Sequence, residues 1–360
     1  MLRTGLGSST AMLRHRVWNG LNFTAARSFV TVEKTTPGSS PHDQLLALQS
    51  ELAMSLRSTT SASFTAEDTD ANTNTKKKVL STRKPLVISA EILELTERQF
   101  PKHPALARAH NDHGFVLKSE QEYGPAIDSY VKSLQIYEDC LGRTSPSWVL
   151  VLKNLSAVFR EAAISKEKPE EREEKDQLCI RAREASDDSL KHARMWLEKV
   201  REEAKDEDSM YGEGEIAKAE EMVVDCLVNG AFTLMLQARS LSSSSSGKKA
   251  EREKGKVAKV LITKAHGLAT EASSDFALKG LKLAKVQNAE ASALLALSNP
   301  KAALPLFMSA LETRREALGD SHDDTVVAMY GVAECYDGLG EKDKATEIRE
   351  FIIREKMNGL

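Results

Sequence analysis

The feature that most constrains this 360-residue sequence is an internal repeat whose copies lie 177 positions apart. Six positions between 126 and 159 carry the same residue, or a second aromatic residue, 177 positions later. The register needs no gap, and the pairs are Ala126/Ala303, Tyr130/Phe307, Leu134/Leu311, Leu141/Leu318, Gly142/Gly319 and Phe159/Tyr336. Self-similarity of this kind predicts an array of repeated structural units.

Each unit carries a pattern that suits two packed helices. A small residue is followed three positions later by a large one, so that a second helix approaches closely and the gap beside it is filled. These small/large pairs are Gly114/Leu117, Ser156/Phe159, Ala291/Leu294 and Ala333/Tyr336, and a second small residue follows at Ala126, Ala303 and Ala345. Three units also begin with residues that favour a helix start, namely His103-Pro104, Ser145-Pro146 and His322-Asp323.

Composition supports a helical chain and excludes several other classes. The sequence is 41% hydrophobic and 5% aromatic with 19 Gly, which fits poorly with a many-stranded sandwich or barrel. It contains no run of about 18 apolar residues, so an integral membrane protein is disfavoured. The formal net charge of −3 disfavours a dedicated nucleic-acid coat.

The repeat pattern resembles the tetratricopeptide repeat (TPR), and the motifs Leu-Gly-x-x-Ser-Pro at 141–146 and Leu-Gly-x-x-His-Asp at 318–323 resemble the kinesin light chain subclass. The resemblance covers residues 104–357. It implies an all-α, right-handed superhelical solenoid of about five antiparallel helix pairs, with the first helices lining a concave groove. We place this domain at 86–357, where 86–100 forms a helix that caps the first repeat.

Two stretches depart from the repeat spacing. The charged run KEKPEEREEKD lies within an insertion near 163–177, which we expect to be a solvated helix end or a loop. The run SLSSSSSGKKAEREKGK forms an insertion near 240–256, which we expect to be polar and mobile.

The amino-terminal segment has the composition of a targeting sequence. Residues 1–32 contain no Asp or Glu but include Arg3, Arg14, Arg16 and Arg27. This pattern predicts a mitochondrial transit peptide and a matrix location; the alternative is a basic disordered tail. Residues 33–85 are expected to be a mostly disordered leader with an amphipathic helix near 43–57, which docks either on its own domain or on a partner.

No residue pattern indicates catalysis, a cofactor or a metal site. The four cysteines are isolated, and the sequence has neither a nucleophile elbow nor a phosphate-binding glycine loop. His110 and His113 could share one helix face, but no third ligand accompanies them. We therefore predict a non-enzymatic protein without a cofactor.

The resemblance also places candidate binding residues in the concave groove. Asparagine side chains there would bind the backbone of an extended partner, and cations would suit an acidic one. Taken singly, each could equally be an ordinary solvent-facing residue. The candidates are Arg108, Asn111, Phe115, Lys118, Lys153, Asn154, Arg160, Lys285 and Asn288. Phe115 and Val228 stand where chaperone-binding members have polar residues, so chaperone-tail binding is not predicted.

Three functions remain open. The first is a mitochondrial scaffold, assembly factor or complex subunit that binds a protein segment. The second is an RNA-associated role in mitochondrial RNA processing or the ribosome, in which the lysines between 248 and 264 contact phosphates. The third is a cytosolic cargo adaptor, against which the missing heptad coiled coil and the leader both argue.

Overall fold

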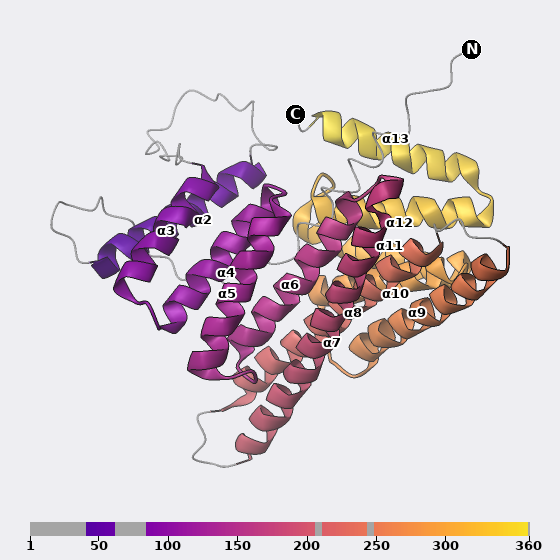
Figure 1. Cartoon of the computed structure of the whole chain (residues 1–360). Helices are drawn as coiled ribbons and strands as arrows, with labels where there is room; N and C mark the ends of the chain where they lie inside the picture. The colour runs from indigo at the N-terminus through magenta and orange to yellow at the C-terminus, as the bar shows by residue number, and fades with distance from the viewer. Residues whose placement is uncertain (1–40, 62–83, 206–210, 243–247, 359–360) are drawn as a thin grey trace, which may run out of the picture. The chain divides into compact units, whose positions relative to one another are not determined.

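The computed structural model describes residues 41–61, 84–205, 211–242 and 248–358, and within them the regular structure is entirely helical (Figure 1). The predicted transit peptide at 1–32 and most of the predicted leader at 33–85 lie outside the described residues. The helices are α2 (Pro41–Ser61), α3 (Pro85–Gln99), α4 (Pro104–Ser119), α5 (Tyr123–Leu141), α6 (Pro146–Ser165), η1 (Pro169–Glu171), α7 (Arg172–Glu203), α8 (Glu213–Ser242), α9 (Lys248–Ser274), α10 (Gly280–Ala296), α11 (Pro300–Leu318), α12 (Asp323–Leu339) and α13 (Lys342–Asn358).

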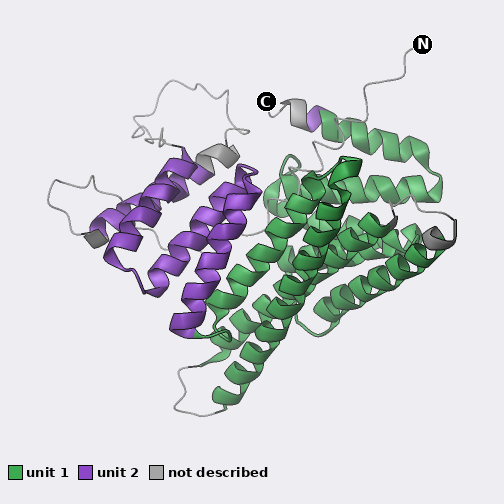
Figure 2. Cartoon of the chain, viewed as in Figure 1, with its two compact units in different colours: residues 1–21, 142–353 green, residues 22–141, 354–360 purple. Residues whose placement is uncertain are grey.

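Two compact units divide these helices (Figure 2). Unit 1 includes Gly142–Ile353 and therefore holds α6 to α12 with most of α13. Unit 2 includes α2 to α5. Within each unit, helices adjacent in sequence pack against each other as antiparallel neighbours (Figure 1). This arrangement confirms the predicted all-α fold of sequential helix pairs.

Unit 2 is built around an apolar cluster on α2, α3 and α4. Leu45 and Leu52 on α2 are buried against Ile88 and Ile92 on α3. The amphipathic helix expected near 43–57 is thus observed as α2, and its apolar face packs on its own chain. The pair α4 and α5 closes where Gly114 faces the ring of Tyr130, which is fully buried.

Unit 1 contains the helix pairs α6/α7, α8/α9, α10/α11 and α12/α13. The first helices α6, α8, α10 and α12 contact one another in sequence, and we call them the first-helix layer. Among the described residues, the second helices α7, α9 and α11 make at most marginal contact with one another. The first-helix layer is therefore the more closely packed layer of unit 1.

The predicted small positions account for this packing. Ser156, Ala291 and Ala333 are fully buried in the first-helix layer. Phe307 on α11 fills a site lined by α10 and α12, where Gly331 leaves room for its ring. At both Gly114 and Gly331, an aromatic ring of a neighbouring helix occupies the space that a side chain would otherwise fill.

Side chains cap the helix starts that the sequence marks. Ser145 accepts a hydrogen bond from the backbone amide of Trp148 at 3.2 Å, while Pro146 occupies the first turn of α6. His103 and His322 accept from the amides of Ala105 and Asp324, both at 3.1 Å. Each cap satisfies an amide that has no partner within its helix.

The two insertions form more helix than expected. The stretch near 163–177 contains the end of α6, the single turn η1 and the first residues of α7, a 32-residue helix. Near 240–256, α8 continues to Ser242 and residues 248–256 are the first turns of α9. Lys, Arg, Glu and Ala are strong helix formers, so a solvated charged run extends a helix that is already nucleated.

Candidate functional site

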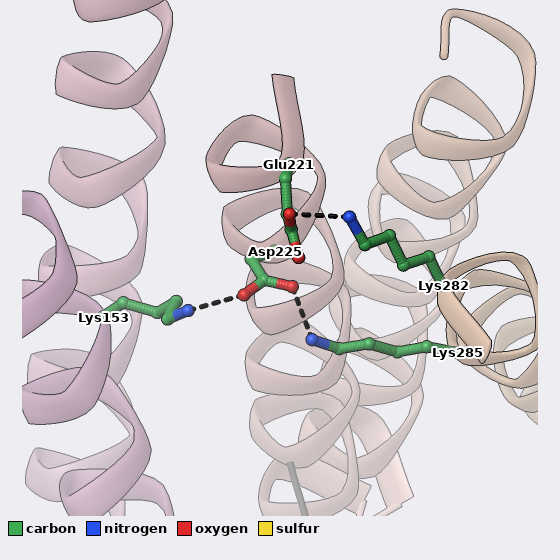
Figure 3. A network of polar contacts seen from close by, with 5 residues as sticks. All are labelled: Lys153, Glu221, Asp225, Lys282 and Lys285. Atoms are coloured by element: carbon green, nitrogen blue, oxygen red, sulfur yellow. Dashed lines mark hydrogen bonds and ion pairs between the residues drawn. The ribbon is translucent and has the colours of Figure 1, made fainter. Parts of the chain in front are cut away.

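Three successive members of the first-helix layer meet at one carboxylate (Figure 3). Asp225 on α8 accepts a hydrogen bond from Lys153 Nζ on α6 at 2.7 Å through its Oδ2 atom. Its Oδ1 atom accepts from Lys285 Nζ on α10 at 2.5 Å. The structure therefore brings together two of the predicted groove lysines, on an acid that the sequence analysis did not select.

The bridge differs from a surface ion pair because its side chains are largely shielded from solvent. The side chains of Lys153, Asp225 and Lys285 are 9%, 23% and 18% exposed. Burial alone would raise the pKa of Asp225, but the two lysines hold it well below its ordinary value. Burial would likewise lower the pKa of Lys153, yet the Asp225 carboxylate and its hydrogen bond leave it raised. Asp225 and Lys153 are accordingly charged at neutral pH.

A second ion pair lies at the outer rim of the same cluster. Lys282 Nζ lies 2.6 Å from Glu221 Oε2, one helical turn along α8 from Asp225 (Figure 3). Both side chains are more than one third exposed, so this pair contributes at most about 1 kcal/mol. Three lysines stand against two carboxylates, which leaves the cluster with one excess positive charge.

Arg160 on α6 forms a separate buried network with α8. Its Nη1 atom donates to Asn229 Oδ1 at 2.6 Å and to Thr233 Oγ1 at 3.3 Å. The Asn229 side-chain amide donates in turn to the hydroxyls of Ser156 and Ser186. Burial lowers the pKa of Arg160 to about 10, with a smaller opposing effect from Glu161. Its hydrogen bonds here go to neutral oxygens, in contrast to the Asp225 bridge.

Asn288 and Asn154 are buried in the same layer. Asn288 Oδ1 on α10 accepts from Arg314 Nη1 at 3.4 Å, and Arg314 also donates to the Asp324 backbone oxygen at 2.7 Å. Asn154 on α6 is 8% exposed. These predicted groove residues therefore belong largely to the contacts between helices.

The remaining predicted groove residues lie on α4 in unit 2. Arg108 is exposed and lies 3.8 Å from Asp112, which also accepts from Asn111 at 3.1 Å. The ammonium group of Lys118 lies 5.3 Å from the centre of the Phe115 ring, a cation–π geometry. Lys118 itself is buried, whereas Asn111 and Phe115 are half-buried.

The sequence analysis missed Asp225 and Asn229, although the sequence does mark both. Asp225 stands alone among Val223, Val224, Cys226 and Leu227. An acid within an apolar helix run is buried with its neighbours, and a buried carboxylate is costly unless a cation pairs with it. This setting therefore indicates a buried ion pair. Asn229 interrupts the same apolar run and signals a buried hydrogen-bond network in the same way.

The described residues offer little for metal or nucleophilic chemistry. No group of three or more His, Cys, Asp or Glu side chains among them is arranged to hold a metal ion. Burial raises the pKa of Cys179, Cys226 and Cys335 to about 11, which keeps these thiols protonated at neutral pH. Within the described part of the chain, no helix is long and apolar enough to cross a membrane.

Comparison with known proteins supports the repeat interpretation for the carboxyl-terminal region. Residues 282–348, from α10 to the start of α13, match the family model of the tetratricopeptide repeat. The chain is similar to two solved structures of kinesin light chain nearly identical TPR-like repeats from Podosopora anserina, each 13% identical, with TM-scores of 0.41 and 0.40. The matches cover 71% of this chain and 97% and 98% of those chains. Among curated proteins, none matches this sequence.

Proposed function

We propose that this chain is a non-enzymatic interaction scaffold of the mitochondrial matrix, which binds a segment of a partner protein along its first-helix layer. The observation that carries this proposal is the Asp225 bridge with its rim pair, which presents one excess positive charge where α6, α8 and α10 meet. The tetratricopeptide match over 282–348 supports a role in protein binding.

The bridge defines how an acidic partner would bind. Lys153 and Lys285 are held by Asp225, so their geometry is fixed before any partner arrives. Lys282 is about half exposed and pairs with the partly exposed Glu221, so it can exchange that pair for a partner carboxylate at low cost. Lys282 is therefore the residue that we expect to contact the partner directly, while Lys153 and Lys285 set the local potential.

The mitochondrial part of the proposal rests on the sequence of residues 1–32. Four arginines without any acid suit import, because the receptors and the membrane potential act on a cationic amphipathic segment. Fractionation of cells that express the full chain with a carboxyl-terminal tag tests this part. Recovery in the matrix fraction with a shortened amino terminus supports it, whereas an uncleaved cytosolic protein would contradict it and favour the adaptor role.

Co-purification from the same cells tests the binding part. We expect a fixed set of proteins to accompany the wild-type chain and to be lost from the Lys282→Glu variant. The matched control is Lys342→Glu, the same charge change at an exposed residue at the start of α13. Equal recovery from both variants would contradict binding at this cluster, and partners that are lost after nuclease treatment would favour the RNA-associated role.

A further inference from the structure

The outward face of α9 is a second surface, distinct from the first-helix layer. Helix α9 packs against α8 and α10 through Ala258, Ala265, Ala269 and Ala272, all of which are buried. On the opposite side, four exposed residues form one stripe with helical spacing, namely Lys256, Val260, Thr263 and Gly267. This stripe spans 12 residues of helix, or about 17 Å between its ends.

The face is strongly cationic although the chain as a whole has a formal net charge of −3. Arg252, Lys256, Lys259 and Lys264 are exposed on it, and Glu253 is the one exposed acid among the side chains of α9 that the structure describes. Glu253 pairs with Lys256 at 2.8 Å, and Lys264 lies 3.9 Å from Asp187 on α7. All four side chains in these two pairs are at least half exposed, so the pairs are weak and can be exchanged.

Aliphatic side chains lie between these cations. Val257 is 51% exposed and Val260 is 67% exposed, the latter being among the most exposed large apolar side chains in the described residues. A purely solvated helix face gains nothing from such residues, because β-branched side chains are also weak helix formers. The combination of exposed valine and flanking cations suits a partner that is apolar at its centre and acidic at its edges.

Two exposed glycines on α9 also indicate a docking surface. A side chain at Gly255 or Gly267 would meet nothing within 4 Å, so no contact with the described part of the chain requires glycine there. Glycine is nevertheless the poorest residue for a helix interior apart from proline. Gly267 lies two turns from Val260 on the same stripe, where the absence of a side chain would let the backbone of another helix come close.

We propose that this face of α9 is a docking site for an acidic amphipathic helix of a protein partner. The valines would pack against its apolar stripe, its carboxylates would pair with Lys256 and Lys259, and its backbone would approach Gly267. RNA fits less well, because the face presents no aromatic side chain for base stacking and its valines contribute nothing to phosphate binding. A lipid surface also fits less well, since such faces depend on larger residues such as Trp, Phe and Leu.

The experiment measures binding of a synthetic helical peptide, with a Leu/Ala stripe flanked by Glu, to the full chain. We expect a dissociation constant below about 1 mM that weakens steeply with added salt, and weaker binding of a scrambled peptide. Lys256→Glu combined with Lys259→Glu should weaken binding at least about tenfold. The control pair Lys301→Glu with Lys342→Glu makes the same charge change at exposed positions elsewhere and should bind like the wild type.

Gly267→Leu separates docking from folding. The replacement faces open space and raises helix propensity, so the thermal midpoint should stay unchanged or rise. Binding should nevertheless weaken at least about tenfold, because the leucine holds the partner helix away. Gly267→Ala, which adds one methyl group, should have a smaller effect.

Three results would overturn the proposal. The first is that the designed peptide binds no better than its scrambled form. The second is that Gly267→Leu binds as tightly as the wild type. The third is that polyuridine RNA or phosphatidylserine vesicles bind more tightly than the peptide, with an affinity that the Val260→Ser substitution does not change. Since Lys282 lies on α10 and not on this face, failure here leaves binding by the first-helix layer untouched, and the converse also holds.

Discussion

Unit 1 buries an ionisable side chain in its charged state, whereas unit 2 buries one in its neutral state. In unit 1, Asp225 is buried as an anion between two ammonium groups. In unit 2, burial is the main cause that lowers the pKa of both His110 and His113, that of His110 to about 4, with Lys132 adding to the effect on His110. His110 is therefore neutral at pH 7, and Glu97 opposes its shift only in part.

This difference teaches that packed helices can offset the free-energy cost of burying an ionisable group in two ways. A cluster of paired charges keeps an electrostatic potential that can attract a binding partner. Its stability, however, requires side chains from three helices. A neutral imidazole needs no counter-charge, but it destabilises the folded state when a fall in pH protonates it. The two solutions also respond to different perturbations, which gives direct ways to separate the units.

The largest expected effect comes from removing the shared anion in unit 1. Asp225→Ala leaves Lys153 and Lys285 partly buried without a counter-charge and should lower the free energy of unfolding by about 2–4 kcal/mol. Chemical denaturation followed by circular dichroism measures it. Glu221→Gln removes a carboxylate from the exposed rim pair and should cost less than about 1 kcal/mol. Similar losses in the two variants would show that the bridge is no stronger than a surface pair.

The next largest effect tests how tightly each unit packs an aromatic ring against glycine. A methyl group at Gly331 would overlap the ring of Phe307, and Gly331→Ala should cost about 1–3 kcal/mol. At Gly114 the added atom would lie 3.2 Å from the Tyr130 ring, so Gly114→Ala should cost less. Thermal denaturation of both variants gives the comparison. A greater loss at Gly114 would reverse the inferred order of packing.

Acid should weaken unit 2 before it weakens the Asp225 bridge. The folded-state pKa of His110 lies below its unfolded value, so the unfolded chain takes up a proton first as the pH falls from about 6.5 to about 4. Since one pKa unit corresponds to about 1.4 kcal/mol, unit 2 should lose about 1–3 kcal/mol in that window. The pKa of Asp225 is also depressed, so its contribution is complete above about pH 4 and is lost only below it.

Hydrogen exchange at several pH values measures this separation. Between pH 6.5 and 4, amides of α4 should lose protection while those of α8 keep it. His110→Phe, which cannot be protonated, should reduce the loss in α4. Equal loss in both helices, or no change on substitution, would contradict the assignment to His110.

The smallest effect concerns the helix caps. Ser145→Ala leaves the Trp148 amide at the start of α6 without its acceptor and should cost about 1 kcal/mol. His103→Ala at the start of α4 should cost less, because histidine is a weaker cap. Thermal denaturation of each variant beside the wild type ranks the two caps. A greater cost for His103→Ala would show that its ring contact with Phe100 also contributes.

The sequence was sufficient to predict the helix pairs and most of their packing. Gly114, Ser156, Ala291 and Ala333 are recognisable because a close helix crossing demands a small residue at a fixed spacing, which is a local property. The caps at 103, 145 and 322 are local in the same sense. Each depends on residues within one or two turns, so the spacing alone was enough.

The candidate site was harder to predict because its contacts are distant in the sequence. Asp225 pairs with residues 72 and 60 positions away. The extra residues in α7, α8 and α9 shift the register between these pairs, so repeat spacing cannot align the three side chains. The family register places Lys153 and Lys285 in an open groove. It does not reveal that α8, which lies between α6 and α10 in the first-helix layer, supplies their counter-ion.

The Asp225 bridge also has a consequence for the order of synthesis on the ribosome. Lys153 is made before Asp225 and can pair with it at once, whereas Lys285 follows 60 residues later. At about 5–20 residues per second, the carboxylate waits about 3–12 s for its second ammonium group. A nascent chain halted in this interval would hold the Asp225 carboxylate with only one of its two ammonium partners. The length of the segment from the second half of α8 to the start of α10 thus sets the time before the bridge can be complete.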